Sequence, residues 1–339
     1  MKKITSTELA KLAKVSQSTV SFVLNNNTNV KISAETRNRV INLAKEYGYG
    51  PFAEKNAGEM MDEVVVILPT FINPYYPMLL SLIVSELQLN NLRCVVCCTD
   101  KDINEERKIL ETYDRYQTRA LLYTFTPQAK EEAKKFAQSH PLFVLCEVDY
   151  DINATIVALN SKKAGMLAID HLASLGHKNI AFISNAIDKL SISRRERLEG
   201  IQTYAHNHNI YVKVFTVPDN IEYENELDLG YLLTQKVIND PMNFTAIIAA
   251  NDYTAIGSIN AIMDAGLSIP EDFSIMGFDN LEISKTYHPP ITTIDHNLFE
   301  RVQLAIELLI SKRNKSQQIF ISYDPILIAR DSTGEIKKS

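Results

Sequence analysis

The sequence predicts a small all-helical domain of about 50 residues, followed by a larger α/β domain built from two doubly wound lobes. Three observations support this division. The first 50 residues carry short, capped helical patterns, whereas the chain after residue 62 alternates apolar runs with helical stretches. Residues 1–50 hold eight Lys or Arg and three Glu, a net charge of +5. Because the whole chain carries −6, residues 51–339 carry −11.

The first two helices follow from their caps and their apolar spacing. Thr5 and Glu8 have the spacing of a capping box, so a helix is expected to begin just after Thr5. Ser16 is a good N-cap for a second helix, which should run from about Gln17 to Leu24. A tight turn of three residues, 14–16, joins the two helices. This is the pattern of a helix-turn-helix, whose second helix fits the DNA major groove.

A third helix completes the small domain. Ser33 should cap a helix from Ala34 to about Tyr47, and Gly48 should end it. Three such helices can share one small core. The positive charge of the domain suits a segment that neutralises phosphates, so we expect it to bind DNA. The alternative is a purely structural appendage.

Composition restricts the class of protein. A chain of 339 residues is long enough for two or three domains. No apolar run approaches the roughly 18–20 residues that span a bilayer, and no apolar signal core follows Lys2 and Lys3. We therefore expect a cytoplasmic protein that does not interact with membranes.

The cysteines do not form a metal-binding or redox pattern. Cys94, Cys97 and Cys98 lie in one apolar run, and Cys146 lies in another. A strand would point Cys94 and Cys97 to opposite faces, and no second ligand pair or nearby His completes a zinc set. We interpret these residues as core thiols and expect neither a metal nor a cofactor.

The long domain shows continuous apolar runs, which are typical of parallel strands buried on both faces. The predicted strands are 64–68, 94–98, 120–123, 142–146, 180–183, 246–249 and 274–278. The predicted crossover helices include 78–90, 103–116 and 162–175. Two doubly wound lobes are the natural arrangement of these elements.

Residues 4–50 resemble the head of the LacI family of bacterial repressors. The matching segments are 15–25 (ValSerGlnSerThrValSerPheValLeuAsn), 31–33 (LysIleSer), 36–37 (ThrArg) and 47–51 (TyrGlyTyrGlyPro). The rest of the chain resembles the effector domain of that family, which is similar to periplasmic binding proteins that take up sugars. The motifs that carry this resemblance lie at 73–77, 171–181, 197–200, 250–257, 269–280, 289–296 and 328–334.

The resemblance implies a domain organisation and a set of partners. Residues 1–50 would be the DNA-binding head, 51–63 a hinge, and 64–339 the effector-binding and dimerisation domain. One lobe would comprise about 64–160 and 292–322, and the other about 161–291 and 323–339. The implied protein is a homodimeric transcriptional regulator, a repressor that binds double-stranded operator DNA. A small molecule, a sugar or sugar phosphate, would control it.

Candidate site residues follow from these positions. In the head, the N-terminal part of the second helix faces base edges in such motifs. The candidates for DNA binding are Thr5, Ser16, Gln17, Ser18, Thr19, Ser21, Phe22, Asn25, Lys31 and Tyr47. In doubly wound lobes the ligand lies outside the carboxyl ends of the strands. The candidates for effector binding are Phe71, Tyr75, Glu147, Arg197, Asn251, Asp252, Asp279 and His296.

The chemistry of these side chains fits a hydroxyl-rich ligand. Carboxylates at strand ends accept hydrogen bonds from hydroxyl groups, and an Arg supplies a fork of donors. The alternatives are structural. Asp252 could cap a helix, Asp279 could be an ordinary carboxylate at the start of a loop, and Arg197 could form a surface ion pair.

The head and the hinge depart from the family pattern at three places. Lys14 stands where the turn usually has Gly, so a left-handed residue there would cost about a kcal/mol. Phe22 stands where an Arg is common in the recognition helix. Gly58 falls where the hinge has the Leu that wedges into the minor groove, with Met60 and Met61 as the nearest apolar residues.

The pocket departs from the pattern as well. Cys146 and Glu147 fill the place of a frequent Asp-Arg pair, Leu159 replaces an Asp, and His296 replaces a frequent Gln. These differences leave the identity of the effector open.

Two other function classes are possible. One is a sugar-binding module with weak or lost DNA function, against which the basic head argues. The other is an enzyme on a doubly wound fold. No catalytic constellation or phosphate-binding Gly loop is present in the sequence, so we expect no catalytic residues and no enzymatic activity.

Overall fold

A computed structural model describes residues 5–24, 32–47, 61–116, 118–187, 192–218, 225–311 and 318–336. The chain divides into two compact units, Met1–Met60 and Met61–Ser339. Within the described residues, no helix has both the length and the apolar character needed to cross a membrane. Gly58, Met60, Asn25 and Lys31, which the sequence analysis singled out, lie outside the described residues.

The first unit contains the three helices that the sequence predicts, which confirms this part of the prediction. They are α1 (Ser6–Ala13), α2 (Gln17–Leu24) and α3 (Ala34–Glu46). Their apolar faces meet in one small core, made by Leu9, Ala10, Ala13, Val20, Val23, Val40 and Ala44. Leu12, which the helical spacing places on the inner face, is 46% exposed and stays outside this core.

The helix ends in this unit are set by local hydrogen bonds. Thr5 and Glu8 form the full capping box at α1. The hydroxyl oxygens of Ser16 and Ser33 accept the backbone N–H groups of Thr19 and Thr36 at 3.1 and 3.2 Å, as N-caps of α2 and α3.

Lys14 ends α1 in the left-handed conformation, with φ 52° and ψ 47°. Its backbone N–H donates to the carbonyl oxygens of Ala10 and Lys11. The turn therefore keeps the geometry that usually requires Gly, in spite of the Cβ of Lys14. We expect this to cost about 1–2 kcal/mol.

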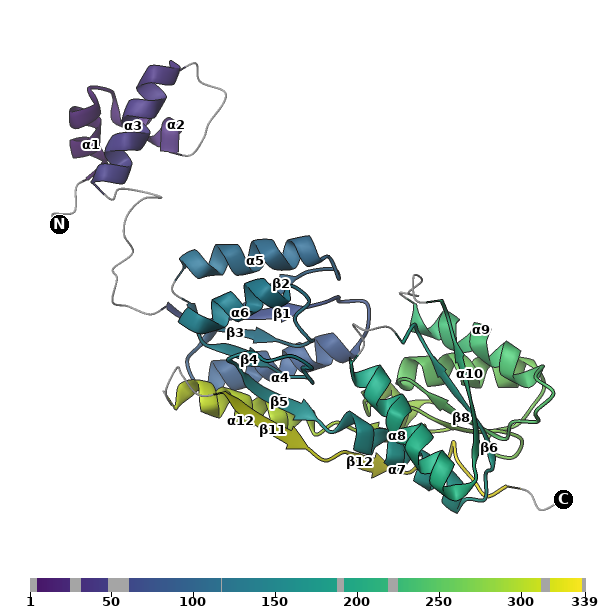
Figure 1. Ribbon diagram of the computed structural model, residues 1–339. Helices are drawn as coiled ribbons and strands as arrows, with labels where there is room; N and C mark the ends of the chain where they lie inside the picture. The colour runs from purple at the N-terminus through teal and green to yellow at the C-terminus, as the bar shows by residue number, and fades with distance from the viewer. Residues whose placement is uncertain are drawn as a thin grey trace. The chain divides into compact units, whose positions relative to one another are not determined.

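The first lobe of the second unit is a parallel six-stranded sheet in the order β11-β5-β4-β3-β1-β2. Its strands are β1 (Met61–Leu68), β2 (Arg93–Cys98), β3 (Thr118–Tyr123), β4 (Leu142–Val144), β5 (Thr155–Leu159) and β11 (Ile319–Tyr323). Helices α4 (Tyr75–Leu89) and α12 (Leu298–Ile310) cover one face, and α5 (Ile103–Arg115) and α6 (Lys130–Ser139) cover the other (Figure 1).

The second lobe is a parallel four-stranded sheet in the order β7-β6-β8-β9. Its strands are β6 (Asn179–Ser184), β7 (Tyr211–Thr216), β8 (Ala246–Ala249) and β9 (Ser274–Met276). Helices α7 (Ser161–Ser174) and α8 (Ile192–His208) cover one face, and α9 (Glu226–Ile238) and α10 (Asp252–Asp264) cover the other. A short helix, α11 (Glu282–Thr286), follows β9.

The chain passes between the two sheets three times. It crosses after β5, between β10 (Thr293–Asp295) and α12, and between β11 and β12 (Ile326–Ile328). Strands β10 and β12 pair antiparallel, and Thr292 forms a bridge with Met276 at the edge of the second sheet. The segment 292–295 thus lies beside the second lobe, and the chain enters the first lobe again with α12.

Each of the seven predicted strands overlaps an observed strand, so the predicted doubly wound fold is confirmed. Cys94 packs in the core on one face of the first sheet and Cys97 in the core on the other, as a strand requires. All four cysteines are free and half-buried.

Candidate functional site

A cavity of about 310 Å³ lies between the two lobes of the second unit, outside the carboxyl ends of their strands. Its walls come from both lobes. Five of the eight predicted effector-binding residues line it: Tyr75, Arg197, Asn251, Asp279 and His296. The loops that follow parallel strands converge at this edge, which explains why residues distant in sequence meet here.

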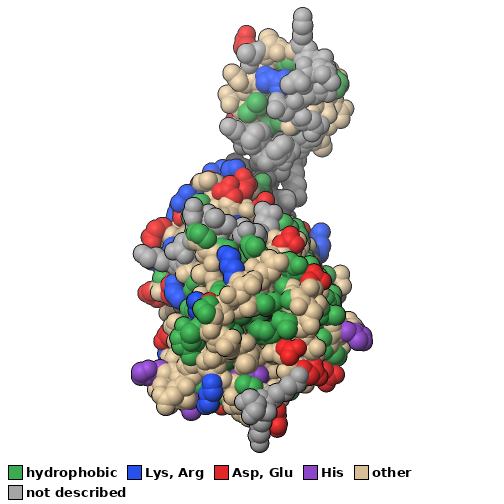
Figure 2. Space-filling view, turned by 90° about the vertical axis from the view of Figure 1, so that its right-hand side faces the viewer, with side chains coloured by type: hydrophobic (Ala, Val, Ile, Leu, Met, Phe, Trp, Pro, Cys, Tyr) green, Lys and Arg blue, Asp and Glu red, His purple; other side chains and the backbone are tan. Residues whose placement is uncertain are grey.

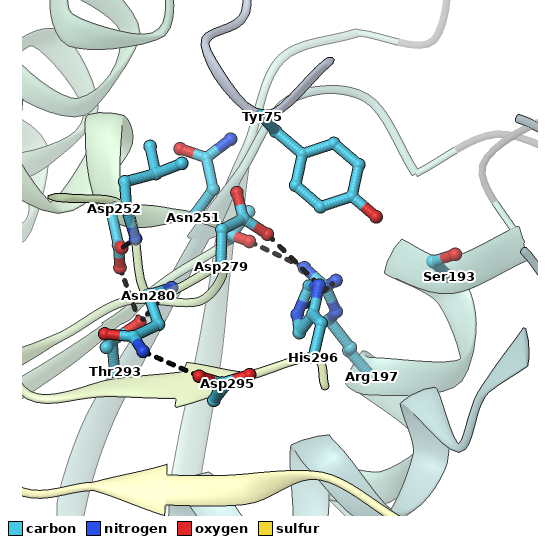
Figure 3. A network of polar contacts seen from close by, with 12 residues as sticks. Tyr75, Ser193, Arg197, Asn251, Asp252, Asp279, Asn280, Thr293, Asp295 and His296 are labelled. Atoms are coloured by element: carbon cyan, nitrogen blue, oxygen red, sulfur yellow. Dashed lines mark hydrogen bonds and ion pairs between the residues drawn. The ribbon is translucent and has the colours of Figure 1, made fainter. Parts of the chain in front are cut away.

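Asp279, His296 and Arg197 form a polar cluster in the cavity wall (Figure 3). The Arg197 Nη2 lies 3.3 Å from the His296 Nε2, and the His296 Nδ1 lies 3.5 Å from the Asp279 Oδ1. Because a guanidinium only donates, the His296 Nε2 must accept. The ring proton therefore sits on Nδ1 and points to Asp279.

Burial decides the charge states in this cluster. It raises the pKa of Asp279 well above its usual value, against the opposing effect of the Arg197 charge. Burial also lowers the pKa of His296 well below its usual value, and the charges of Arg197 and Arg301 lower it further. His296 is therefore neutral, in agreement with its role as acceptor from Arg197.

The guanidinium of Arg197 is fixed from several sides. Its Nη1 donates to the carbonyl oxygen of Ala250 at 2.8 Å, and its Cζ lies 4.5 Å from the centroid of the Phe278 ring. Its Nε is buried and lacks a hydrogen-bond partner among the described residues. An Arg held in this way presents donors to the cavity and does not form the surface ion pair that the sequence left open.

The position of Arg197 depends on close packing of α7 against α8. A Cβ built on Gly165 of α7 would lie 2.8 Å from the Arg197 carbonyl carbon and would overlap the carbonyl oxygen. A Cβ on Gly200 of α8 would overlap the Lys162 carbonyl oxygen in the same way. Two glycines thus let the helix backbones touch, and this contact sets how far α8 reaches toward the cavity.

Asn251 and Tyr75 complete the polar wall. Asn251 caps α10, since its Oδ1 accepts the Thr254 N–H at 2.8 Å. The Tyr75 ring meets the His296 ring edge-on, with the centroids 5.9 Å apart. Burial raises the pKa of Tyr75 to about 12, so its phenol stays protonated at neutral pH.

Polar pairs join the two lobes around the cavity. They include Asn73 Nδ2 with Glu226 Oε2 at 2.9 Å, Ser193 Oγ with Glu147 Oε2 at 2.6 Å, and Arg195 Nη2 with Asp149 Oδ2 at 3.1 Å. The Glu226 Oε2 also accepts from Asn251 Nδ2 at 2.5 Å. Glu226 therefore connects amides of both lobes at the cavity.

Three predicted effector-binding residues do not line the cavity. Phe71 is 52% exposed, because the chain turns it outward before α4. Glu147 is buried and accepts from Ser193, which does line the cavity. Asp252 is completely buried behind Asn251, where it accepts from Leu281 N and Thr293 Oγ1 at 2.8 and 2.6 Å.

Sequence reasoning also missed wall residues. The cavity is further lined by Asn73, Tyr76, Lys101, Glu106, Gln128, Ser193, Arg194 and Glu226, among others. Asn73 belongs to the motif at 73–77, whose spacing did not place it in the site, whereas Tyr76 of the same motif was expected from its aromatic ring to stack on a sugar face. The sequence around Glu226 did not indicate a site, because Glu226 is the first residue of α9, where an acidic side chain is common for structural reasons.

In the first unit, six of the ten predicted DNA-binding residues lie in α2 or directly before it. Ser16, Gln17, Ser18 and Ser21 are exposed, whereas Thr19 and Phe22 are half-buried. The Gln17 Nε2 donates to the Ser6 hydroxyl at 2.6 Å. Thr5 is exposed at the α1 cap, and Tyr47 is exposed after α3.

Comparison with known proteins identifies both units. Residues 5–51 match the bacterial regulatory proteins of the lacI family, and residues 169–333 match a periplasmic binding protein-like domain. The chain belongs to the LacI family of bacterial regulatory proteins. As a LacI-family member it is a DNA-binding transcriptional regulator and not an enzyme, which confirms both expectations from the sequence.

Relatives match over nearly the whole chain. The ribose operon repressor of Escherichia coli K12 is 28% identical over 333 residues, which cover 96% of this chain and 98% of the relative. A LacI family regulator from Enterococcus faecium, solved with bound ribose, has 23% identity and a TM-score of 0.70, covering 81% of this chain and 100% of its own. The Lac repressor dimer bound to operator and an anti-inducer has 24% identity and a TM-score of 0.70, covering 98% and 100%.

Proposed function

We propose that this LacI-family regulator is a repressor that a neutral sugar controls by binding in the cavity between the two lobes. The observation that carries the proposal is the cluster of Asp279, His296 and Arg197 in the cavity wall. It presents a carboxyl group and a guanidinium side by side. Such a pair can accept from one ligand hydroxyl and donate to another.

The charges around the cavity favour a neutral ligand over a sugar phosphate. Its lining has three cationic side chains, Lys101, Arg194 and Arg197, and three acidic ones, Glu106, Glu226 and Asp279. A phosphate carries about −1.5 to −2 charges and would need an excess of cations. The guanidiniums of Arg197 and Arg194 already donate to the carbonyl oxygens of Ala250 and Ala186, which leaves them fewer donors for a phosphate.

The size of the cavity favours a small sugar. A volume of about 310 Å³ lies at the lower end of the range of roughly 300–1,000 Å³ that ligand pockets have. The E. coli relative is named for the ribose operon, and the E. faecium neighbour holds ribose. D-Ribose is therefore the first sugar to test.

The first unit would bind operator DNA through the N-terminal part of α2, with Gln17 and Ser18 facing base edges. Two copies of the chain would place two heads on one operator, as in the dimeric neighbour. Exposed apolar side chains in the second unit, such as Leu89 and Phe320, support association. Figure 2 shows one face of this unit on which hydrophobic side chains gather. Such a regulator acts in the cytoplasm, where the DNA lies.

Ligand control requires that the sugar bind the two states of the lobes with different affinity. The pairs Asn73–Glu226 and Ser193–Glu147 bridge the lobes and would break when the cleft opens. A ligand held by both walls would stabilise the closed state. The change would reach the heads through the hinge of residues 51–63.

The experiment is a titration of the operator complex with D-ribose and a panel of other sugars, for the wild type and for Asp279→Ala. We expect Asp279→Ala to abolish the response to the sugar and to leave ligand-free operator binding intact. Asp264→Ala, which removes an exposed carboxylate of α10, is the matched control. An Asp279→Ala response at the wild-type sugar concentration would place the effector elsewhere. Operator binding by residues 62–339 alone would refute the role of the head.

A further inference from the structure

We propose that Asp252 is the positioning residue of the sugar site, holding the loop 277–281 so that Asp279 faces His296 and Arg197. The inference rests on the function proposed above, because it assigns a role within the same site. Asp252 is fully buried and does not reach the cavity, so it cannot act by contact with the ligand.

Asp252 forms hydrogen bonds with the loop on both sides of Asp279. Its backbone N–H donates to the Phe278 carbonyl oxygen at 2.9 Å. Its Oδ2 accepts the backbone N–H of Leu281 at 2.8 Å. These two bonds fix the residues that flank Asp279 and Asn280, and they leave only two residues of the loop between the fixed points.

The loop needs these two hydrogen bonds, here called the clamp, because its backbone conformation is strained. Asp279 has φ 101° and Asn280 has φ 51°, so two consecutive residues with a Cβ lie in the left-handed region. That region is unfavourable for residues other than Gly and persists only where the surroundings impose it. Without the clamp, the loop would relax and Asp279 would turn away from His296.

The same carboxylate connects the loop to the segment that carries His296. The Thr293 hydroxyl donates to the Asp252 Oδ1 at 2.6 Å and accepts the Asn280 N–H at 3.3 Å. Thr293 begins β10, and His296 directly follows that strand. Figure 3 shows Asp252 and Thr293 on one side of Asp279, and His296 with Arg197 on the other.

The loop leaves room for the Asp252 carboxylate at a glycine. A Cβ on Gly277 would overlap the Asp252 Oδ1, so the loop approaches the carboxylate at a residue without a side chain. The cap of α10 is already supplied by Asn251. The Asp252 side chain is therefore not needed to start the helix, and its two oxygens serve the loop and β10.

The test compares Asp252→Ala with Asp252→Asn in the full chain. An Asn side chain keeps an acceptor for the Leu281 N–H, and its amide can donate to the Thr293 hydroxyl, so it should preserve the loop. We expect Asp252→Ala to weaken D-ribose binding at least about tenfold by calorimetry, and Asp252→Asn by less than about threefold.

A second measurement does not depend on the ligand. In the free wild type, the NMR signal of the His296 Nδ1 proton should lie downfield and be protected from solvent exchange, because this proton faces Asp279. In Asp252→Ala the signal should move upfield and the proton should exchange faster, because Asp279 turns away, while Arg197 still keeps the ring proton on Nδ1. A loss of folding stability alone would not shift this signal, so this readout separates positioning from a structural role.

An Asp252→Ala variant with wild-type ribose affinity and an unchanged His296 Nδ1 proton signal would overturn the inference. If Asp252→Ala does not fold, Thr293→Val decides, since it removes the donor to Oδ1 and should shift that signal in the same direction. If the wild type binds none of the sugars, the proposed ligand class fails. The His296 Nδ1 proton signal then still tests the role of Asp252.

Discussion

Replacing Gly165 by Ala should move Arg197 out of the sugar site. The added Cβ would lie 2.8 Å from the Arg197 carbonyl carbon. Carbon atoms in good contact are about 3.5–4.0 Å apart, so α7 and α8 would have to separate by about 0.7–1.2 Å. Because the obstacle is helix backbone, no side-chain rotation can relieve the overlap.

The cost in stability can be worked out from this geometry. Overpacking costs about 1–3 kcal/mol, and backbone overlap falls at the upper end. The better helix propensity of Ala offsets about 1 kcal/mol. A net loss of about 2 kcal/mol should lower the melting temperature by roughly 4–8 °C.

The cost in affinity follows from the reach of Arg197. Its Nη1 lies 2.8 Å from the Ala250 carbonyl oxygen, so a shift of about 1 Å breaks this bond and misaligns the donors that face the ligand. Hydrogen bonds to charged groups contribute about 1.5–3 kcal/mol. We therefore expect D-ribose affinity to fall roughly tenfold to a hundredfold.

The assay is thermal unfolding and ribose calorimetry on Gly165→Ala, with Gly266→Ala as the matched control. Gly266 has φ +76°, and a Cβ added there would meet no other atoms, so Ala is strained without displacing a helix. It should lower stability by a similar amount, about 1–2 kcal/mol, and leave ribose affinity unchanged. If Gly165→Ala loses stability but keeps its affinity, the packing of α7 does not set the position of Arg197.

Three further predictions address other parts of the molecule. Lys14→Gly should stabilise the head by about 1 kcal/mol, because it removes the Cβ of a residue in the left-handed conformation, and should slow amide hydrogen exchange of Val20 in the full chain. Unchanged exchange would show that the backbone at Lys14 is not strained. Glu226→Ala should enlarge the ligand-free radius of gyration in X-ray scattering, because it removes a bond between the lobes, and an unchanged radius would show that this carboxylate does not hold them together. Burial lowers the pKa of His177 below its unfolded value of about 6.5, so the stability that neutral His177 contributes is present above that pH and is lost as the pH falls below it. His177→Gln should therefore show a smaller drop in melting temperature between pH 7.5 and 5.5 than the wild type, and equal drops would assign the effect to other groups.

The sequence by itself determined the elements whose causes are local. The capping box of Thr5 and Glu8 and the cap at Ser16 involve residues three apart, so the spacing alone reveals them. Continuous apolar runs marked the buried parallel strands for a similar reason. The edge strands β7 and β11 escaped prediction, because their exposed faces interrupt the apolar pattern. The inner strand β5 was also missed, although it is buried.

Only the tertiary structure decided which side chains reach the cavity. Asn251 and Asp252 both follow β8, and no local pattern tells which of them faces the ligand. Asn251 is the extended N-cap residue and Asp252 the first residue of α10, so their side chains point in different directions: Asn251 lines the cavity, while Asp252 is buried behind it. The bond between Asn73 and Glu226 joins residues 153 positions apart on different lobes. Such a contact depends on how two separately folded sheets meet, and that geometry is set by packing across the whole unit.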